Sequence, residues 1–330
     1  MIRLAAALAA AVLLVAASAR ASGFQFLSVP DGPAKPIEIG IWYPSEAPVA
    51  PASLGRLNQM VAVNGAIAGA GLPLVVISHG TGGWFASHLD TAQALADAGF
   101  VAVALTHPGD NFADESDIGL RSMIARPRQI RRVLDFMTRS WPGHDHLNPS
   151  AIGMFGFSAG GFTTLVAIGG MPDWRQFASH CAADPGEPMC RQGGAAVLSS
   201  AMAAALPQTS WVHDSRIKAA LVASPGWAFA FTPPSLRGID IPVALWGGAD
   251  DPIVPPATNL QFLKEQLPQV TAMTVAAGAG HYAFLAPCNA AQRMRLPELC
   301  VDAPGFDRPA FHRNFDQAAI AFFRATLSGR

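Results

Sequence analysis

Residues 151–165, AIGMFGFSAGGFTTL, contain the pattern that is most informative about the fold of this chain. An apolar run typical of a buried strand leads into the pattern G-x-S-x-G, and an apolar helical pattern follows. So tight a strand-to-helix turn holds Ser158 in a strained conformation with its Oγ exposed, and side chains at Gly156 or Gly160 would collide with neighbouring backbone. The helix N-terminus behind Ser158 favours negative charge on a reacting oxygen. The stretch therefore predicts a reactive serine at the edge of a sheet.

Short apolar runs alternate with longer helical patterns on both sides of this turn. The runs at 74–77 and 101–105 are apolar on both faces, as expected for parallel strands that helices cover on each side. We expect strands at residues 24–29, 37–43, 74–78, 100–106, 151–157, 217–223, 243–246 and 273–276. We expect helices at 87–98, 127–139, 160–168, 256–266 and 308–327, with Asp307 capping the last. The pattern predicts one α/β domain with a mostly parallel eight-stranded sheet and helices on both faces.

Residues 171–215 interrupt this alternation between one predicted helix and the next strand. The segment contains two of the cysteines and a helical pattern at 195–205. Loops of this length in compact domains are usually lids or binding elements, so we interpret the segment as a cap. The alternative is a surface elaboration without a role at the site.

The first 21 residues have the pattern of a signal peptide. A positive end at Arg3, an apolar run from Leu4 to Ala17 and a small-x-small pattern at 19–21 predict cleavage after Ala21. The run is shorter than the roughly 20 apolar residues that a membrane anchor needs, and no later stretch is long and apolar enough to cross a bilayer. We therefore expect an exported protein, periplasmic or secreted, whose residues 22–330 form the folded domain.

Cysteine usage fits an oxidising compartment. Four cysteines in an exported chain suggest two disulfides, chosen from three possible pairings. We predict the local pairs Cys181–Cys190 and Cys288–Cys300, because each pair flanks a proline-containing stretch that looks like a loop. Neither pair has the C-x-x-C spacing of a zinc knuckle, which favours structural bridges over a metal site.

Composition and motifs argue against several classes of protein. Apolar residues make up 51% of the chain and the formal net charge is −1, which excludes intrinsic disorder. The 22 basic residues face 23 acidic ones and form no dense run, so nucleic acid is not expected as a partner. The pattern His144-Asp145-His146 resembles half of a metal motif, but no further ligand lies near it in the sequence, so we predict no metal there.

A glycine-rich loop, SHGTGG at 78–83, follows an earlier buried strand. Its spacing matches neither the P-loop nor the dinucleotide-binding pattern, so a nucleotide is not expected. Such a loop lets backbone N–H groups turn toward a ligand. We expect the amides of Thr81 and Ala159 to bind a developing oxyanion together.

Two later strands end in residues that can complete a catalytic set. The strand at 242–246 leads to Asp250 and Asp251, and the strand at 273–276 leads to His281. The carboxyl ends of parallel strands share one edge of an open α/β sheet, so a carboxylate and an imidazole should lie there beside Ser158. The chain order Ser, acid, His is that of α/β-hydrolases.

These segments together resemble the α/β-hydrolase superfamily and, within it, the bacterial predicted dienelactone hydrolases that are similar to platelet-activating-factor acetylhydrolase. The resemblance covers nearly all of residues 24–328, least clearly the segment 171–215. It implies Ser158 as nucleophile, His281 as base and Asp251 as acid, with Asp250 as the alternative acid. True dienelactone hydrolases use a cysteine nucleophile, so the serine favours ordinary ester hydrolysis over lactone specificity. The matching segments are residues 78–83, 106–111, 156–161 and 278–288.

The residue types predict hydrolysis of a carboxylic ester, small or lipid-like, through an acyl-enzyme and without metal or cofactor. Two alternatives stay open: acyl transfer to an alcohol by the same residues, and a binding protein of the same fold without turnover. Most aromatic residues fill cores, but Trp84, Phe112 and Trp227 are candidates to line a substrate pocket.

Overall fold

The computed structural model describes residues 21–55, 57–191 and 211–329 of the 330-residue chain. The predicted signal peptide lies outside these residues except for Ala21, where the first strand begins. The helical pattern predicted at 195–205 lies wholly outside them. No helix among the described residues is long and apolar enough to cross a membrane.

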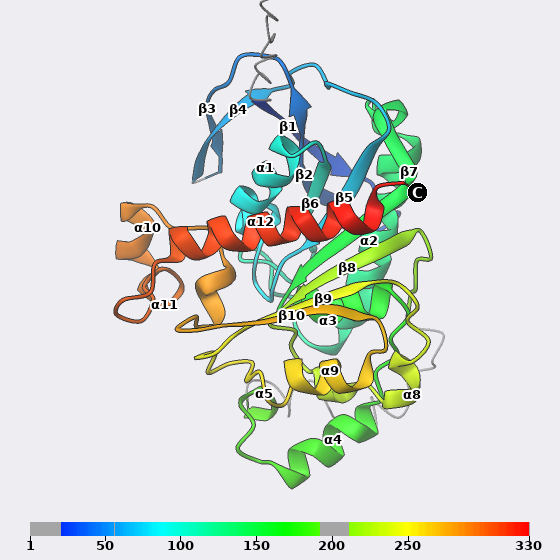
Figure 1. Ribbon diagram of the computed structural model, residues 1–330, viewed down its shortest axis with the longest axis vertical. Coiled ribbons are helices and arrows are strands. Elements are labelled where there is room, and N and C mark those ends of the chain that lie inside the picture. Colours follow the sequence, from blue (N-terminus) through cyan, green and yellow to red (C-terminus); the bar gives the residue numbers. More distant parts are fainter. Residues whose placement is uncertain (1–20, 56, 192–210, 330) are drawn as a thin grey trace, which may run out of the picture.

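The centre of the described chain is a ten-stranded sheet in the order β10-β9-β8-β7-β5-β6-β2-β1-β4-β3 (Figure 1). The six strands from β10 to β6 in this order run parallel, whereas β2 is antiparallel to both β6 and β1. All of the predicted strands are present. The bounds are β1 Ala21–Val29, β2 Ile37–Ser45, β3 Ala50–Leu54, β4 Leu57–Val63, β5 Leu72–Ser78, β6 Val101–Thr106, β7 Leu147–Phe157, β8 Ile217–Ala223, β9 Val243–Gly248 and β10 Val270–Ala276.

The predicted count of eight strands is wrong, because β3 and β4 form an additional hairpin at one end of the sheet. Pro51 in β3 has no N–H to donate, which argues against a strand unless that strand lies at an edge. β3 is the last strand in the order, so its missing donor disrupts no ladder on the outer side. Gly55, with φ +61°, lies at the turn between the two strands.

Helices cover both faces of the sheet (Figure 1). On one face α1 (Leu89–Asp97) packs against α12 (Arg308–Leu327), and on the other α2 (Leu120–Arg139) packs against α3 (Ala159–Ala167). Alternate side chains of β5 divide between the two resulting cores, because successive residues of a strand point to opposite faces. The remaining helices are α4 Trp174–Ala183, α5 Pro188–Arg191, α8 Pro233–Leu236, α9 Leu260–Gln266, α10 Ala290–Arg295 and α11 Pro297–Cys300.

Helix α12 has the predicted bounds, and the side chain of Asp307 caps it by accepting from the N–H of Ala310 at 2.9 Å. Helix α2, in contrast, begins at Leu120 rather than at the predicted residue 127. Pro127 is a helix-interior proline, and its buried face continues that of Met123. Packing of this face against the sheet therefore outweighs the hydrogen bond that proline cannot donate.

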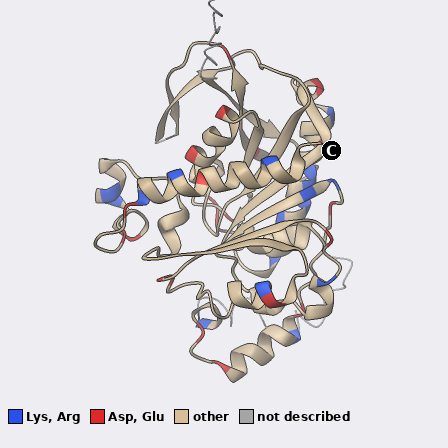
Figure 2. Cartoon of the chain, viewed as in Figure 1, with Lys and Arg blue, Asp and Glu red and all other residues tan. Residues whose placement is uncertain are grey.

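Charged residues lie mainly on helices and loops (Figure 2). In the ten described strands only Glu38 of β2 and Lys218 of β8 are charged. A sheet covered on both faces offers no water to solvate an ion, so charge is confined to its ends and periphery.

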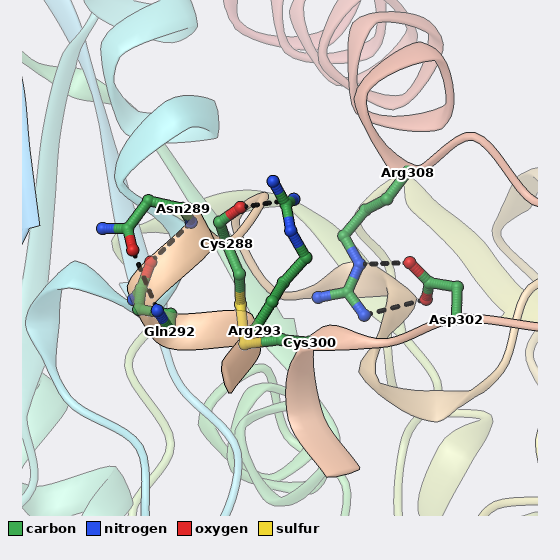
Figure 3. Close-up of a disulfide and its surroundings, with 7 residues drawn as sticks. All are labelled: Cys288, Asn289, Gln292, Arg293, Cys300, Asp302 and Arg308. Carbon is green, nitrogen blue, oxygen red and sulfur yellow. Dashed lines mark hydrogen bonds and ion pairs between the residues drawn. A yellow bond between two sulfur atoms is a disulfide. The ribbon is translucent and has the colours of Figure 1, made fainter. Parts of the chain in front are cut away.

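Both predicted disulfides are present. Cys181–Cys190 joins α4 to α5 within the described part of the predicted insertion. Cys288–Cys300 joins the segment before α10 to the end of α11 (Figure 3).

The surroundings of the second disulfide connect it to α12 (Figure 3). Arg293 donates to the carbonyl of Cys288 at 2.7 Å. Arg308, in the first turn of α12, donates to both carboxylate oxygens of Asp302, each at 2.8 Å. This two-point pair is largely buried, so it fixes the segment after Cys300 against the start of the helix.

Candidate active site

Ser158 lies on the turn between β7 and α3, with φ 56° and ψ −118°. Its N–H donates to the carbonyl of Ala223 and its carbonyl accepts from the N–H of Gly226, so the end of β8 holds the turn in place. A Cβ at Gly156 would lie 2.1 Å from the carbonyl oxygen of Gly160, and a Cβ at Gly160 would lie 2.0 Å from that of Ser78. Only glycine fits at either position, because the turn is so tight. The same tight turn holds Ser158 at its strained positive φ.

His281 follows β10 and lies between Ser158 and Asp251. Its Nε2 is 3.0 Å from Ser158 Oγ, and its Nδ1 is 2.8 Å from Asp251 Oδ2. A carboxylate only accepts, so the contacts fit an imidazole that donates from Nδ1 to Asp251 and accepts at Nε2 from the serine hydroxyl. His281 and Asp251 are 4% and 5% exposed, whereas Ser158 is partly open to solvent.

Asp251 is held by the loop that follows β9. Its Oδ1 accepts from the N–H groups of Ile253 at 2.9 Å and Val254 at 2.8 Å, which leaves Oδ2 for His281. Asp250 is exposed, and its backbone N–H donates to the carbonyl of Ala279. Of the two carboxylates that the sequence left open, the structure brings Asp251 to the imidazole.

Thr81 and Ala159 flank Ser158 from two loops. Ala159 is the first residue of α3, so its N–H has no partner within the helix. A Cβ at Gly80 would lie 3.2 Å from Ser158 Cβ, which places the loop before Thr81 directly against the serine. Neither the N–H of Thr81 nor that of Ala159 donates a hydrogen bond to any of the described residues. Both amides are therefore available to an oxygen bound beside Ser158.

A buried ion pair beneath this loop was not predicted. Arg126 of α2 donates from Nε to Asp110 Oδ2 at 2.9 Å, from Nη1 to the carbonyl of His79 at 2.7 Å and from Nη2 to that of Gly80 at 3.1 Å. Asp110 Oδ1 accepts from the N–H of Gly82 at 2.9 Å. The two side chains are 1% and 2% exposed. Burial raises the pKa of Asp110, but the charge of Arg126 and the hydrogen bonds from Gly82 and Arg126 together outweigh burial and hold that pKa below its ordinary value.

Two buried histidines complete this region. His79 Nε2 accepts from the backbone N–H of His107, so His79 carries its proton on Nδ1, 2.6 Å from the carbonyl oxygen of Gly80. Burial, together with the nearby charge of Arg126, lowers the pKa of His79 to about 3 and that of His107 well below its usual range. Both rings are therefore neutral near pH 7.

Helix α12 and the turn that precedes α1 hold the other side of the site. His312 Nε2 donates to the carbonyl of Ala283 at 2.8 Å, and His88 Nδ1 donates to that of Phe284 at 3.0 Å. These carbonyls lie two and three residues after His281. His312 Nδ1 also lies 2.6 Å from a carboxylate oxygen of Asp90. Although burial opposes it, contact with Asp90 raises the pKa of His312.

The three predicted pocket aromatics lie in different surroundings. Trp84 and Phe112 pack edge to face with ring centroids 5.6 Å apart, and Phe112 is 63% exposed. Trp227, directly after Gly226, is 8% exposed and packs against Phe162 of α3 instead. The first two form an aromatic pair in which Trp84 is half-buried and Phe112 is exposed, and the third belongs mainly to a core.

Among the described residues, side chains able to bind a metal ion gather at one place. His180, Asp184 and Glu187 bring their ligand atoms within 4.8 Å of one another, in and after α4. Of the other histidines, His144 and His146 direct their Nδ1 atoms at the backbone carbonyls of Trp141 and Gly69. A cavity of about 650 Å³ beside His180 is lined by residues of α4 and α9, and none of the predicted catalytic residues lines it.

Comparison with known proteins assigns the fold. No family model matches the chain, and no curated protein matches it. Among solved structures, the chain is similar to a ferulic acid esterase from Streptomyces cinnamoneus, with a TM-score of 0.62 and 17% sequence identity over 97% of this chain and 93% of that one. With the sheet order described above, this similarity identifies the α/β-hydrolase fold.

Proposed function

We propose that this protein is a serine hydrolase that cleaves carboxylic esters through an acyl-enzyme. The proposal rests on one observation: His281 lies within hydrogen-bond distance of both Ser158 Oγ, at 3.0 Å, and Asp251, at 2.8 Å. A nucleophile, a base and a carboxylate that orients the base are the parts that acyl transfer to serine requires.

In the first half of the proposed reaction, Ser158 Oγ attacks the ester carbonyl carbon while His281 Nε2 accepts the hydroxyl proton. Asp251 keeps the imidazole oriented and stabilises it when it becomes charged. The carbonyl oxygen becomes an oxyanion, which the N–H groups of Thr81 and Ala159 bind. His281 then returns the proton to the departing alcohol.

In the second half, water takes the place of the alcohol. The water attacks the acyl carbon while His281 accepts one of its protons. His281 then gives that proton to Ser158 Oγ as the carboxylic acid leaves. These steps need no metal or cofactor. Transfer of the acyl group to an alcohol in place of water is the alternative reaction of the same residues.

We propose further that the substrate is a small or lipid-like ester and that the protein is exported. The resemblance to predicted dienelactone hydrolases similar to platelet-activating-factor acetylhydrolase supports a small or lipid-like ester. The ferulic acid esterase adds esters of aromatic acids as a class to be tested. The aromatic pair of Trp84 and Phe112, of which Phe112 is exposed, is suited to contact such a group. The predicted signal peptide and the two disulfides support an exported protein.

The test is hydrolysis of p-nitrophenyl esters of increasing acyl length and of a feruloyl ester, with the Ser158→Ala variant as the matched control. We expect turnover in the wild type and its loss by about 10⁴-fold or more in the variant. An added alcohol that yields a new ester instead of the acid would favour the acyltransferase. A wild type that neither turns over any ester nor reacts with a fluorophosphonate would refute the proposal and favour a binding protein.

A further inference from the structure

The buried pair Arg126–Asp110 contacts the loop 79–82 at three backbone groups. Arg126 donates to the carbonyls of His79 and Gly80, and Asp110 accepts from the N–H of Gly82. Neither side chain touches Ser158, His281 or Asp251 by hydrogen bond. We propose that this pair positions the Thr81 N–H toward the oxyanion, so that Arg126 and Asp110 are positioning residues for the reaction proposed above.

The orientation of the Gly80–Thr81 peptide supports this role. In a trans peptide the C=O and N–H point in opposite directions, and the described chain contains no cis peptide. The carbonyl of Gly80 points at Arg126 Nη2, so the N–H of Thr81, which belongs to the same peptide, points away from Arg126. Asp110 accepts a hydrogen bond from the next amide N–H, that of Gly82. The peptides on both sides of Thr81 are therefore held by the ion pair, whereas the Thr81 N–H itself stays free to donate.

A second donor holds the same carbonyl. His79 Nδ1 lies 2.6 Å from the oxygen of Gly80, so that oxygen accepts from both the imidazole and the guanidinium. The N–H of Gly83 also donates to this oxygen, at 3.2 Å. Three donors on one carbonyl resist rotation of the Gly80–Thr81 peptide, which has no side chain at Gly80 to restrain it. A preorganised donor needs no reorganisation when charge develops on the substrate, which is why its orientation matters.

The charges around the pair favour a positional role over a stabilising one. A buried ion pair generally contributes little to folding compared with apolar residues of similar size. The titratable groups that face the pair, His79 and His107, are neutral because burial and Arg126 lower their pKa values. The pair therefore keeps its charges, and its hold on the loop, across the neutral pH range.

The experiment compares variants that keep or remove the contacts with the loop. Asp110→Asn and Arg126→Lys alter them with little change in volume, and the double variant Asp110→Leu/Arg126→Met replaces the pair with apolar residues, which avoids an unpaired buried charge. Arg132→Lys is the control, because Arg132 lies on the same helix and makes an exposed pair with Asp31. Circular dichroism and thermal unfolding establish that each variant is folded.

The decisive measurement is the rate ratio between an ester and its thionoester, whose C=S sulfur accepts hydrogen bonds poorly. We expect the loop variants to lower kcat on the ester by about 10- to 100-fold with little change in KM. The ratio should fall by a similar factor, since the thionoester gains little from the oxyanion donors in either protein. Labelling by a fluorophosphonate should slow in parallel, and Arg132→Lys should match the wild type.

Each outcome decides a separate point. A folded double variant with the wild-type kcat and the wild-type ratio overturns the positioning role while the ester hydrolase stands. A lower kcat with an unchanged ratio also overturns it, because the loss then arises elsewhere in the site. A wild type that is neither active nor labelled refutes the hydrolase itself, and the positioning role with it.

Discussion

Two buried polar networks hold the two sides of the candidate site, and they differ in how they respond to pH. On the side of the loop 79–82, a fixed ion pair acts beside histidines whose pKa values are far below neutral. On the side of His281, the carbonyls of Ala283 and Phe284 are held by His312 and His88.

The second network contains a group, Asp316, whose pKa lies near neutral. Burial and the charge of Asp90 raise the pKa of Asp316 to about 7, and contact with Asp90 raises that of His312 against the effect of burial. Similar carbonyl contacts are therefore made on one side by an ion pair that stays charged at neutral pH, and on the other beside a carboxyl group, Asp316, that titrates there.

The largest effect should come from Arg126→Met alone. This change leaves Asp110 buried without its cation, and loss of one partner of a buried pair typically costs about 3 to 5 kcal/mol. The free energy of unfolding in urea would show this loss. The double variant Asp110→Leu/Arg126→Met should recover most of it, and a double variant as unstable as the single one would contradict the interpretation.

Removal of the Cys288–Cys300 disulfide, on the His281 side, should cause the second-largest loss of stability. Cys288 and Cys300 are 12 residues apart, and a bridge of that span contributes roughly 3 kcal/mol in the chain-entropy description. We expect Cys288→Ser/Cys300→Ser to lower the free energy of unfolding by about that amount and to lower kcat. The matched control is Cys181→Ser/Cys190→Ser, whose bridge lies in the described part of the insertion. Equal losses of kcat in both would argue against a specific link to His281.

His312→Ala should cost about 2 kcal/mol, because Ala283 loses its buried donor and Asp90 its partner. The raised pKa of His312 means that the charged ring stabilises the fold below its unfolded pKa, and this contribution is lost as pH rises through the folded pKa. The cost should therefore be larger at pH 6 than at pH 9. Thermal unfolding at the two pH values checks the sign, and a cost that grows with pH would refute it.

The smallest effect should be a stabilisation by Asp316→Asn. The pKa of Asp316 is raised to about 7, so its ionisation opposes folding progressively from about pH 4 and fully above about pH 7. Asparagine keeps an oxygen to accept from Thr91 and removes the charge. The gain in unfolding temperature should be a few degrees at pH 8 and less at pH 5. An equal gain at both pH values would show that the charge is not its cause.

Local patterns predicted those parts of the site that follow strands directly. Ser158, Asp251 and His281 each come after a parallel strand, so the shared edge of the sheet was enough to predict their proximity. Their roles remain predictions. The hairpin β3–β4 was not predicted, because Pro51 made its edge strand look unlike a strand. The buried role of Arg126 was not predicted, because the predicted helix began at residue 127.

The supporting residues had no such signal. Arg126 lies 47 residues from His79, and His312 lies 29 residues from Ala283, with no motif that links either pair. A charged residue on a mostly apolar helix face was the available clue, since such a residue is seldom buried without a partner.

The alternation of strands and helices, the strained serine turn and the order of the catalytic candidates follow from the sequence alone, because they depend on local periodicity and on glycine at fixed positions. The sequence also indicated the two disulfides. The folded structure was needed to show that Asp251 rather than Asp250 contacts His281, and that a buried ion pair holds the loop 79–82. Those contacts form because packing of the helices against the sheet buries particular polar side chains, which must then find partners away from water. Local sequence patterns do not show which side chains are buried in this way.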